Sequence, residues 1–198
     1  MYFDTIRESK EYNAFLMIIG CLIGLYCSFV LSVDSLILAK TPSKVLNCDI
    51  NSRISCSGVS KSHYAAFIPF NGVNVPNAFF GMVIFAGLIG VLLSFLFNKD
   101  VSKILFGILT LGVLACFIFT AFLLTVSMFI LHVLCPYCLA MDCGVILIII
   151  GFVRFYVFEF FDKMHSITFN FNGWIMFLIE TIPFLLIILL IIMNIPNA

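Results

Sequence analysis

Two pairs of cysteines are the residues of this chain best suited to chemistry. Cys135 and Cys138 have two residues between them, and Cys48 and Cys56, in a polar stretch, have seven residues between them. Closely spaced cysteines form structural disulfides, bind zinc or exchange electrons by thiol–disulfide chemistry. Three interpretations therefore compete: a structural disulfide beside an idle C-x-x-C motif, a four-cysteine zinc site, and two redox pairs that exchange electrons.

The composition is that of an integral membrane protein. Of the 198 residues, 63% are hydrophobic and 10% are charged, and the mean hydropathy is +1.22, which excludes an ordinary soluble fold. The net charge is zero and the basic residues are scattered, so the chain lacks the clustered charge that nucleic acid requires. The remaining four cysteines lie within apolar runs, where we expect them to pack as small hydrophobic side chains.

Long apolar runs predict the elements that must position the two cysteine pairs. A run of about 20 apolar residues crosses a hydrocarbon core of about 30 Å. We expect transmembrane helices at residues 14–37, 77–97, 103–131, 134–153 and 174–194, and an extracytoplasmic loop at residues 39–76. The predicted fold is a single all-α membrane domain, residues 1–198, with a four-helix bundle, a fifth transmembrane helix and a loop that carries one cysteine pair.

Two observations predict that the N-terminus is cytoplasmic. This orientation places six lysines and arginines inside and four outside, in the direction of the positive-inside rule. It also places both cysteine pairs on the extracytoplasmic side, where disulfides persist. We therefore expect the active cysteines to face the extracytoplasmic compartment, or the lumen of an organelle.

The position of the C-x-x-C motif favours the redox interpretation. The motif opens the fourth predicted helix, where unpaired N–H groups and the helix dipole stabilise a thiolate. Pro136 suits this first turn because proline has no N–H to lose. The spacing of Cys48 and Cys56 fits a zinc site poorly, so we expect no metal. A non-catalytic four-span scaffold with a structural loop disulfide is the alternative.

A lipid-soluble quinone is the electron acceptor that best suits a dithiol at this depth. A quinone takes two electrons and two protons and needs an apolar pocket with a few polar groups. Asp142 shares a helical face with Cys135 and Cys138. Its carboxyl group, neutral in apolar surroundings, can donate a hydrogen bond to a quinone, unless it is a structural acid bonded to a neighbouring helix.

Further residues are expected at the quinone. Asn77 can donate an amide hydrogen bond to a quinone carbonyl, or can cap the second helix instead. Phe80 and Tyr137 are also expected to contact the quinone. The apolar, proline-broken stretch at residues 64–81 is expected to cap the pocket. We expect no tightly bound cofactor, since the quinone is a substrate.

These features together resemble the vitamin K epoxide reductases and their bacterial thiol-oxidising relatives. The resemblance covers residues 14–153 and is carried by the loop CDINSRISCS, by CPYC at the start of the fourth helix, by the asparagine of NVPNAFFG, and by GLYCSFV in the first helix. It implies a four-helix bundle around a quinone of the vitamin K, menaquinone or ubiquinone type. It also implies an oxidoreductase that takes electrons from thiols.

The resemblance implies a role for each cysteine. Cys138 would attack the quinone, with Cys135 as its partner. Cys56 would form a transient disulfide with Cys135, and Cys48 would meet the external reductant. The side chain of Asn77 would form a hydrogen bond with the quinone oxygen.

Two departures from the family pattern shape the remaining expectations. Asp142 stands where the animal enzymes have a tyrosine, so the resemblance leaves reduction of vitamin K epoxide, and sensitivity to anticoagulants, open. The thioredoxin-like domain of many bacterial relatives is not present in this sequence, so we expect a separate thioredoxin-fold partner outside the cytoplasm. The expected location is the endoplasmic reticulum membrane in a eukaryote, or the plasma (inner) membrane in a bacterium.

Overall fold

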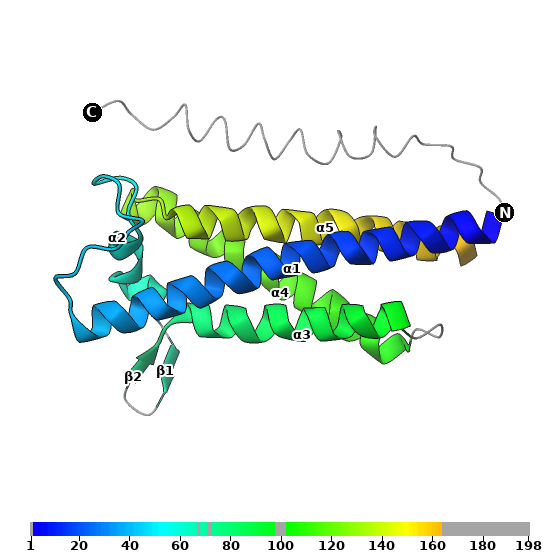
Figure 1. Cartoon of the computed structure of the whole chain (residues 1–198), viewed down its shortest axis with the longest axis horizontal. Coiled ribbons are helices and arrows are strands. Elements are labelled where there is room, and N and C mark those ends of the chain that lie inside the picture. The colour runs from blue at the N-terminus through cyan, green and yellow to red at the C-terminus, as the bar shows by residue number, and fades with distance from the viewer. Residues whose placement is uncertain (1, 67, 71–72, 98–101, 164–198) are drawn as a thin grey trace. The chain divides into compact units, whose positions relative to one another are not determined.

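Four long helices dominate the computed structural model, which describes residues 2–66, 68–70, 73–97 and 102–163 (Figure 1). They are α1 (Tyr2–Lys40), α3 (Asn77–Phe97), α4 (Lys103–Val126) and α5 (Pro136–Lys163). The segments long and apolar enough to cross a membrane are Glu11–Lys40, Asn77–Phe97, Lys103–Leu131 and Pro136–Phe155. The predicted all-α, four-helix membrane architecture is therefore confirmed. The predicted fifth helix, residues 174–194, lies outside the described residues.

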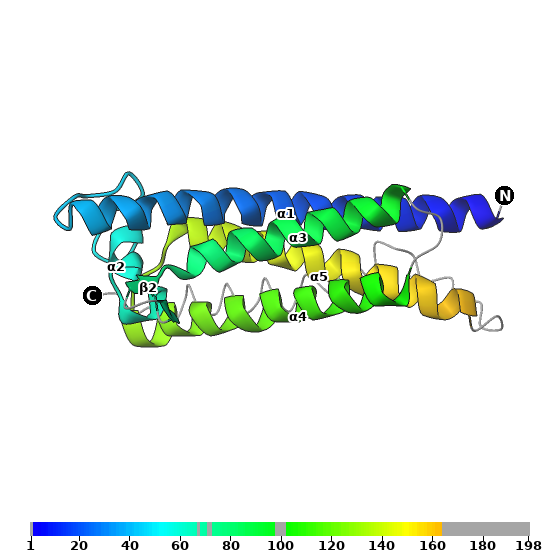
Figure 2. The same cartoon turned by 90° about the horizontal axis from the view of Figure 1, so that it is seen from below.

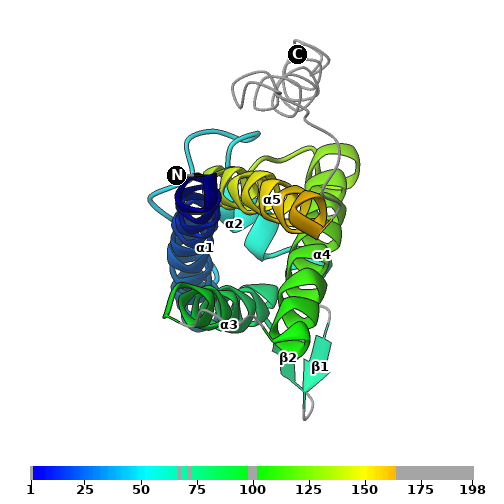
Figure 3. The same cartoon turned by 90° about the vertical axis from the view of Figure 1, so that its right-hand side faces the viewer.

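The four helices surround a common core in the unit that ends at Phe155. Seen end-on, α1 lies between α3 and α5, and α4 closes the ring on the opposite side (Figure 3). The largest fully buried side chains include Met17, Phe85, Leu92, Leu109 and Ile148. Large apolar side chains also cover the outside of the bundle: Leu111 is 69% exposed and Val83 is 72% exposed. Apolar surface both inside and outside is expected where lipid replaces water as the solvent.

Glycine allows α1 and α5 to approach closely. A Cβ atom added to Gly20 would lie 2.5 Å from the carbonyl oxygen of Gly144, and one added to Gly144 would lie 2.8 Å from the carbonyl oxygen of Gly20. Both distances are shorter than a real side chain tolerates. Small residues of this kind let helix backbones pack in membranes, where no hydrophobic force between helices assists them.

The segment between α1 and α3 covers one end of the bundle (Figure 2). It contains a short helix α2 (Cys56–Ser60), a 3₁₀ turn η1 (His63–Ala65), and an antiparallel pair of strands, β1 (Ile68–Phe70) and β2 (Val73–Val75). The strand pair adds regular structure to a stretch in which the sequence indicated only proline breaks. All these elements lie at the end of the bundle where α5 begins.

The connection from α4 to α5 is tight and irregular. The last turn of the third span widens into a π-helix, η2 (Ser127–Leu131), and His132 ends it with a left-handed backbone (φ 52°). Helix α5 begins at Pro136, two residues later than the predicted start of this span, because Leu134 pairs with the loop instead of entering the helix. The C-x-x-C motif thus lies at the first turn of α5, under the loop.

Candidate active site

A short backbone ladder joins the loop to the start of α5. Ile54 and Leu134 form a parallel β-bridge. The N–H of Leu134 donates a 2.7 Å hydrogen bond to the carbonyl of Arg53, and the carbonyl of Leu134 accepts a 3.0 Å hydrogen bond from the N–H of Ser55. Cys56 lies two residues after Ile54, and Cys135 directly follows Leu134. The ladder therefore sets the register that brings a cysteine of the loop next to a cysteine of the helix.

Three of the four predicted redox sulfurs meet at this point. Cys48 and Cys56 are joined by a disulfide, and the sulfur of Cys135 lies 3.6 Å from that of Cys56. Cys135 and Cys138 are free thiols, and Cys48, Cys56 and Cys135 are buried. A thiol in contact with a disulfide sulfur is the arrangement that thiol–disulfide exchange requires. The sulfur of Cys56 therefore has two partners within reach, one in the loop and one on the helix.

The start of α5 favours a thiolate at Cys135. A hydrogen bond from the Cys138 thiol lowers the pKa of Cys135, and backbone N–H groups of Cys138 and Tyr137 add to this effect against the opposing influence of burial. The N–H of Cys138 lies 3.4 Å from the Cys135 sulfur, so the sulfur occupies the position of a helix N-cap. The thiolate is the reactive form of cysteine in exchange, and this one lies beside Cys56.

A carboxylate holds the loop in shape between its two cysteines. Asp49 accepts hydrogen bonds from the N–H of Leu46 (2.8 Å), the hydroxyl of Ser55 (2.7 Å) and the N–H of Ser57 (2.9 Å). Burial alone would raise the pKa of Asp49, but these hydrogen bonds outweigh it and hold that pKa well below its ordinary value. The carboxylate thus ties the segment before Cys48 to the segment around Cys56.

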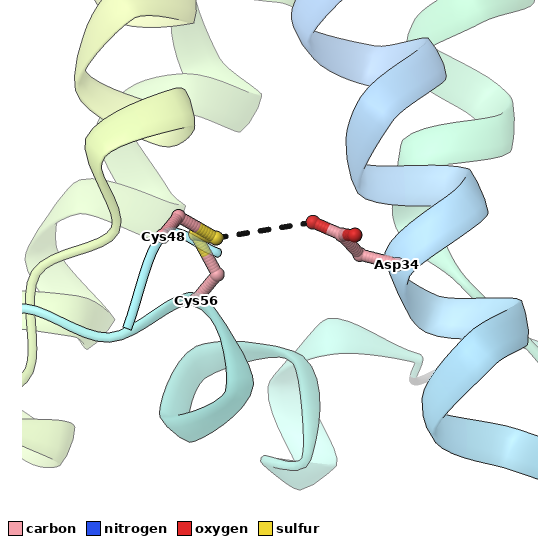
Figure 4. Close-up of side chains that lie close together, drawn as sticks. All are labelled: Asp34, Cys48 and Cys56. Atoms are coloured by element: carbon pink, nitrogen blue, oxygen red, sulfur yellow. Dashed lines mark hydrogen bonds between the residues drawn. A yellow bond between two sulfur atoms is a disulfide. The ribbon is translucent and has the colours of Figure 1, made fainter. Parts of the chain in front are cut away.

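A second carboxyl group approaches the disulfide from α1. Oδ2 of Asp34 lies 3.9 Å from the sulfur of Cys48 (Figure 4). Asp34, Cys48 and Cys56 are also the group of side chains, within the described part of the chain, that lie close enough together to hold a metal ion. While Cys48 and Cys56 share a disulfide they offer no thiolate, the form of cysteine that binds metals.

An apolar cavity of about 130 Å³ lies between the helices and the loop. Its lining includes five predicted residues: Asn77, Phe80, Cys135, Cys138 and Asp142. Residues of the predicted cap also line it, among them Tyr64 and Pro76. The free thiol of Cys138 therefore faces an apolar space that also has an amide and a carboxyl group in its wall.

We expected the amide nitrogen of Asn77 to donate a hydrogen bond to a quinone, but the protein itself takes up this nitrogen. Its amide nitrogen donates a hydrogen bond to the backbone oxygen of Tyr64 at 2.6 Å, and the side chain is 5% exposed. Its Oδ1 atom is buried and has no hydrogen-bond partner among the described residues, and the same is true of the hydroxyl of Ser62. Both residues line the cavity. A buried polar atom without a partner costs about 1–3 kcal/mol, which a bound polar molecule would offset.

Tyr137 does not line the cavity. Its ring packs instead against the two apolar clusters of the bundle, so its predicted contact with a quinone stays a prediction without support from this geometry. Sequence reasoning missed Asp34, Asp49 and Ser62. The signals for the two acids were present: Asp34 directly follows the uncharged run of the first span, and Asp49 directly follows a loop cysteine.

Comparison with known proteins agrees with this geometry. No curated protein matches the chain. The model of the vitamin K epoxide reductase family matches residues 15–155. This range contains the loop, the cavity and the four spans of the structure except the first residues of the first span, which begins at Glu11. The chain therefore belongs to the vitamin K epoxide reductase family.

Proposed function

We propose that the protein is a membrane thiol:quinone oxidoreductase that passes electrons from a partner dithiol, through its own two cysteine pairs, to a quinone. The observation that supports this most strongly is the position of Cys135. Its sulfur touches the loop disulfide at Cys56, while Cys138, one turn further along, lines an apolar cavity. One cysteine of the motif thus contacts the loop disulfide, and the other lines the cavity in which we propose that the quinone binds.

The electron relay consists of two disulfide exchanges. The thiolate of Cys56 attacks the Cys135 sulfur of an oxidised Cys135–Cys138 pair, and Cys138 leaves as a thiolate. Cys48 then attacks the sulfur of Cys56, which releases Cys135 and closes the Cys48–Cys56 disulfide. Two electrons move from the loop to the helix, and the products are the disulfide and free thiols of the present structure.

The quinone step takes the same two electrons onward. The thiolate of Cys138 adds to the quinone, Cys135 attacks the sulfur of Cys138, and the hydroquinone leaves as the Cys135–Cys138 disulfide forms. The protons of the two thiols balance the two protons that the hydroquinone takes up. The carboxyl group of Asp142 can pass one of them, since it lines the same cavity. Oδ1 of Asn77 is suited to accept a hydrogen bond from a hydroxyl of the hydroquinone.

The size of the cavity favours a small head group. A cavity of about 150 Å³ in another protein holds one benzene ring, so about 130 Å³ suits a single-ring head group. A fused two-ring head group, as in vitamin K or menaquinone, requires side chains to move. The ubiquinone head group, with its two methoxy groups and its methyl group, is also larger than this volume. We therefore expect a lower KM for para-benzoquinone than for a short-chain ubiquinone or a menaquinone, and vitamin K epoxide should be assayed separately.

The proposal extends to the partner and the membrane. Cys48 lies in the loop outside the span segments but is buried, so the loop must open locally to admit an external dithiol; a thioredoxin-fold protein of the extracytoplasmic side is the proposed donor. The net result would be disulfide formation in that partner. The proposed location is the endoplasmic reticulum of a eukaryote or the plasma membrane of a bacterium, with the cysteines on the extracytoplasmic side.

Quinone reduction by the purified protein tests the proposal. With dithiothreitol as reductant in detergent micelles, Cys135→Ala and Cys138→Ala should each lose quinone reduction. Cys143→Ala is the matched control, because Cys143 is an exposed thiol on the same helix and does not line the cavity. Turnover retained in either variant of the motif would contradict the proposal. Cys48→Ala should lose more activity with a protein dithiol than with dithiothreitol.

A disulfide trap distinguishes the relay from a scaffold with a structural disulfide. In the double variant Cys48→Ala/Cys138→Ala, the 3.6 Å contact leaves Cys56 and Cys135 as each other's partner. Mild oxidation should join them, which peptide mapping after alkylation would detect. Two thiols that both stay alkylatable would instead favour the scaffold, in which the loop disulfide never exchanges.

A further inference from the structure

Asp34 is an acid placed against a reacting sulfur. It lies on α1 toward the end that carries the loop, and its Oδ2 approaches the sulfur of Cys48 at 3.9 Å (Figure 4). A disulfide sulfur carries no hydrogen, so in the oxidised loop this is a contact. In the reduced loop Cys48 is a thiol, and the same distance lies within reach of an S–H···O hydrogen bond.

The two cysteines of the loop differ in what surrounds them. Cys56 faces Cys135, whose sulfur is supplied with hydrogen bonds at the start of α5. Among the described residues, no backbone N–H donates a hydrogen bond to the sulfur of Cys48, which faces the carboxyl group of Asp34 instead. A thiol that must become a thiolate in exchange needs a group that takes its proton.

We propose that Asp34 is the proton acceptor and donor of Cys48. This inference rests on the proposed relay and adds a catalytic residue to it. When Cys48 attacks the mixed disulfide between Cys56 and Cys135, the carboxylate of Asp34 takes the thiol proton as the new S–S bond forms. When a partner dithiol later displaces Cys48, Asp34 returns that proton to the leaving thiolate. The proton passes from the sulfur of Cys48 to the carboxylate of Asp34 in the first step and returns to that sulfur in the second.

Charges around Asp34 complete this picture. Lys44 and Asp49 both belong to the loop; the charge of Lys44 attracts the carboxylate of Asp34, and the charge of Asp49 repels it. Asp34 in turn repels a thiolate at Cys135, at the start of α5. The titratable groups that face Asp34 are therefore Cys48, Cys135, Asp49 and Lys44. A negative carboxylate also disfavours a standing thiolate at Cys48.

The test follows a single exchange without any quinone. In a Cys56→Ala background, reduced protein is mixed with oxidised 2-mercaptoethanol, a small neutral disulfide, and the mixed disulfide at Cys48 is quantified by mass spectrometry from pH 5 to 9. With the carboxylate as base, the rate should form a plateau below the pKa of the thiol. With Asp34→Asn, the rate should fall about tenfold per pH unit and be at least about tenfold lower at pH 6.

The shape of the profile separates the possible outcomes. Asp34→Asn should match or exceed the parent at pH 9, where hydroxide removes the proton, and Asp34→Glu should restore the plateau. An Asn profile that superimposes on the parent at every pH would overturn the proposal. So would a uniform loss at all pH values, pH 9 included, which would mean that Asp34 only holds the loop in place. If this assay succeeds while the unmodified protein fails to reduce quinones, the proposed function fails and the role of Asp34 stands.

Discussion

Removal of the Asp49 carboxylate should make the loop disulfide easier to reduce. Asp49 accepts three hydrogen bonds, from the N–H groups of Leu46 and Ser57 and from the hydroxyl of Ser55. These bonds connect the chain on either side of the Cys48–Cys56 pair. Without them, the reduced loop must be ordered anew each time the disulfide closes. The substitution Asp49→Ala therefore lowers the equilibrium constant for disulfide formation.

The size of the effect follows from the number of bonds. A hydrogen bond to a charged group contributes about 1.5–3 kcal/mol, and we take about 1 kcal/mol for each because Asp49 is partly exposed. Three bonds then give about 3 kcal/mol, or roughly a hundredfold in the equilibrium constant. For a two-electron couple this raises the reduction potential by up to about 65 mV.

Equilibration in glutathione redox buffers, followed by alkylation and peptide mapping, measures the potential directly. Ser52→Ala is the matched control, because Ser52 is an exposed residue of the same loop. The control should have the same reduction potential as the unsubstituted protein. An Asp49→Ala variant that also does so would refute the reasoning, since it would show that the hydrogen bonds do not order the cysteine pair.

The pH dependence of this contribution has a definite sign. Asp49 has a lowered pKa in the folded protein and an ordinary value of 3.8 when unconstrained. Its stabilisation of the loop is therefore fully present above about pH 4 and is lost as the pH falls toward the lowered value. The difference in potential between Asp49→Ala and the unsubstituted protein should stay constant from pH 5 to 8 once the thiol protons are accounted for. A difference that disappears within that window would contradict the lowered pKa.

Three further predictions concern the bundle and the cavity. Gly20→Val should lower the stability of the detergent-solubilised protein by about 1–3 kcal/mol, because its side chain would meet the backbone of Gly144; Gly87→Val, in open space, should not change the thermal unfolding midpoint. Ser62→Ala should raise the KM for quinone about tenfold without lowering that midpoint, since its buried hydroxyl has no partner to lose within the described structure. An Asn77→Asp variant keeps an acceptor oxygen but loses the bond to the backbone, so it should be less stable; an unchanged unfolding midpoint would contradict the observed amide orientation.

The spans and the position of the C-x-x-C motif could be predicted because each depends on local sequence. Apolar run lengths predicted the four described spans, and α5 begins at Pro136, two residues after the predicted start. The position of Tyr137 away from the cavity also follows from the sequence. Residues two apart do not share a helical face, so the side chains of Tyr137 and Cys135 point in different directions. The contacts of Asn77 and Asp34 could not be predicted, because each depends on a distant partner, the carbonyl of Tyr64 in one case and the sulfur of Cys48 in the other.

The backbone ladder between the loop and α5 explains how one sulfur can serve two partners. The bridge between Ile54 and Leu134 fixes the backbone on both sides, so Cys56 can exchange Cys48 for Cys135 by side-chain rotation alone. A loop that had to swing between the two partners would lose that fixed geometry at each step. The carboxylates fit the proposed relay: Asp49 would keep Cys48 close enough to return, and Asp34 would hold the proton while Cys48 attacks. In that relay, electron transfer from the loop to the helix would require no movement of a helix.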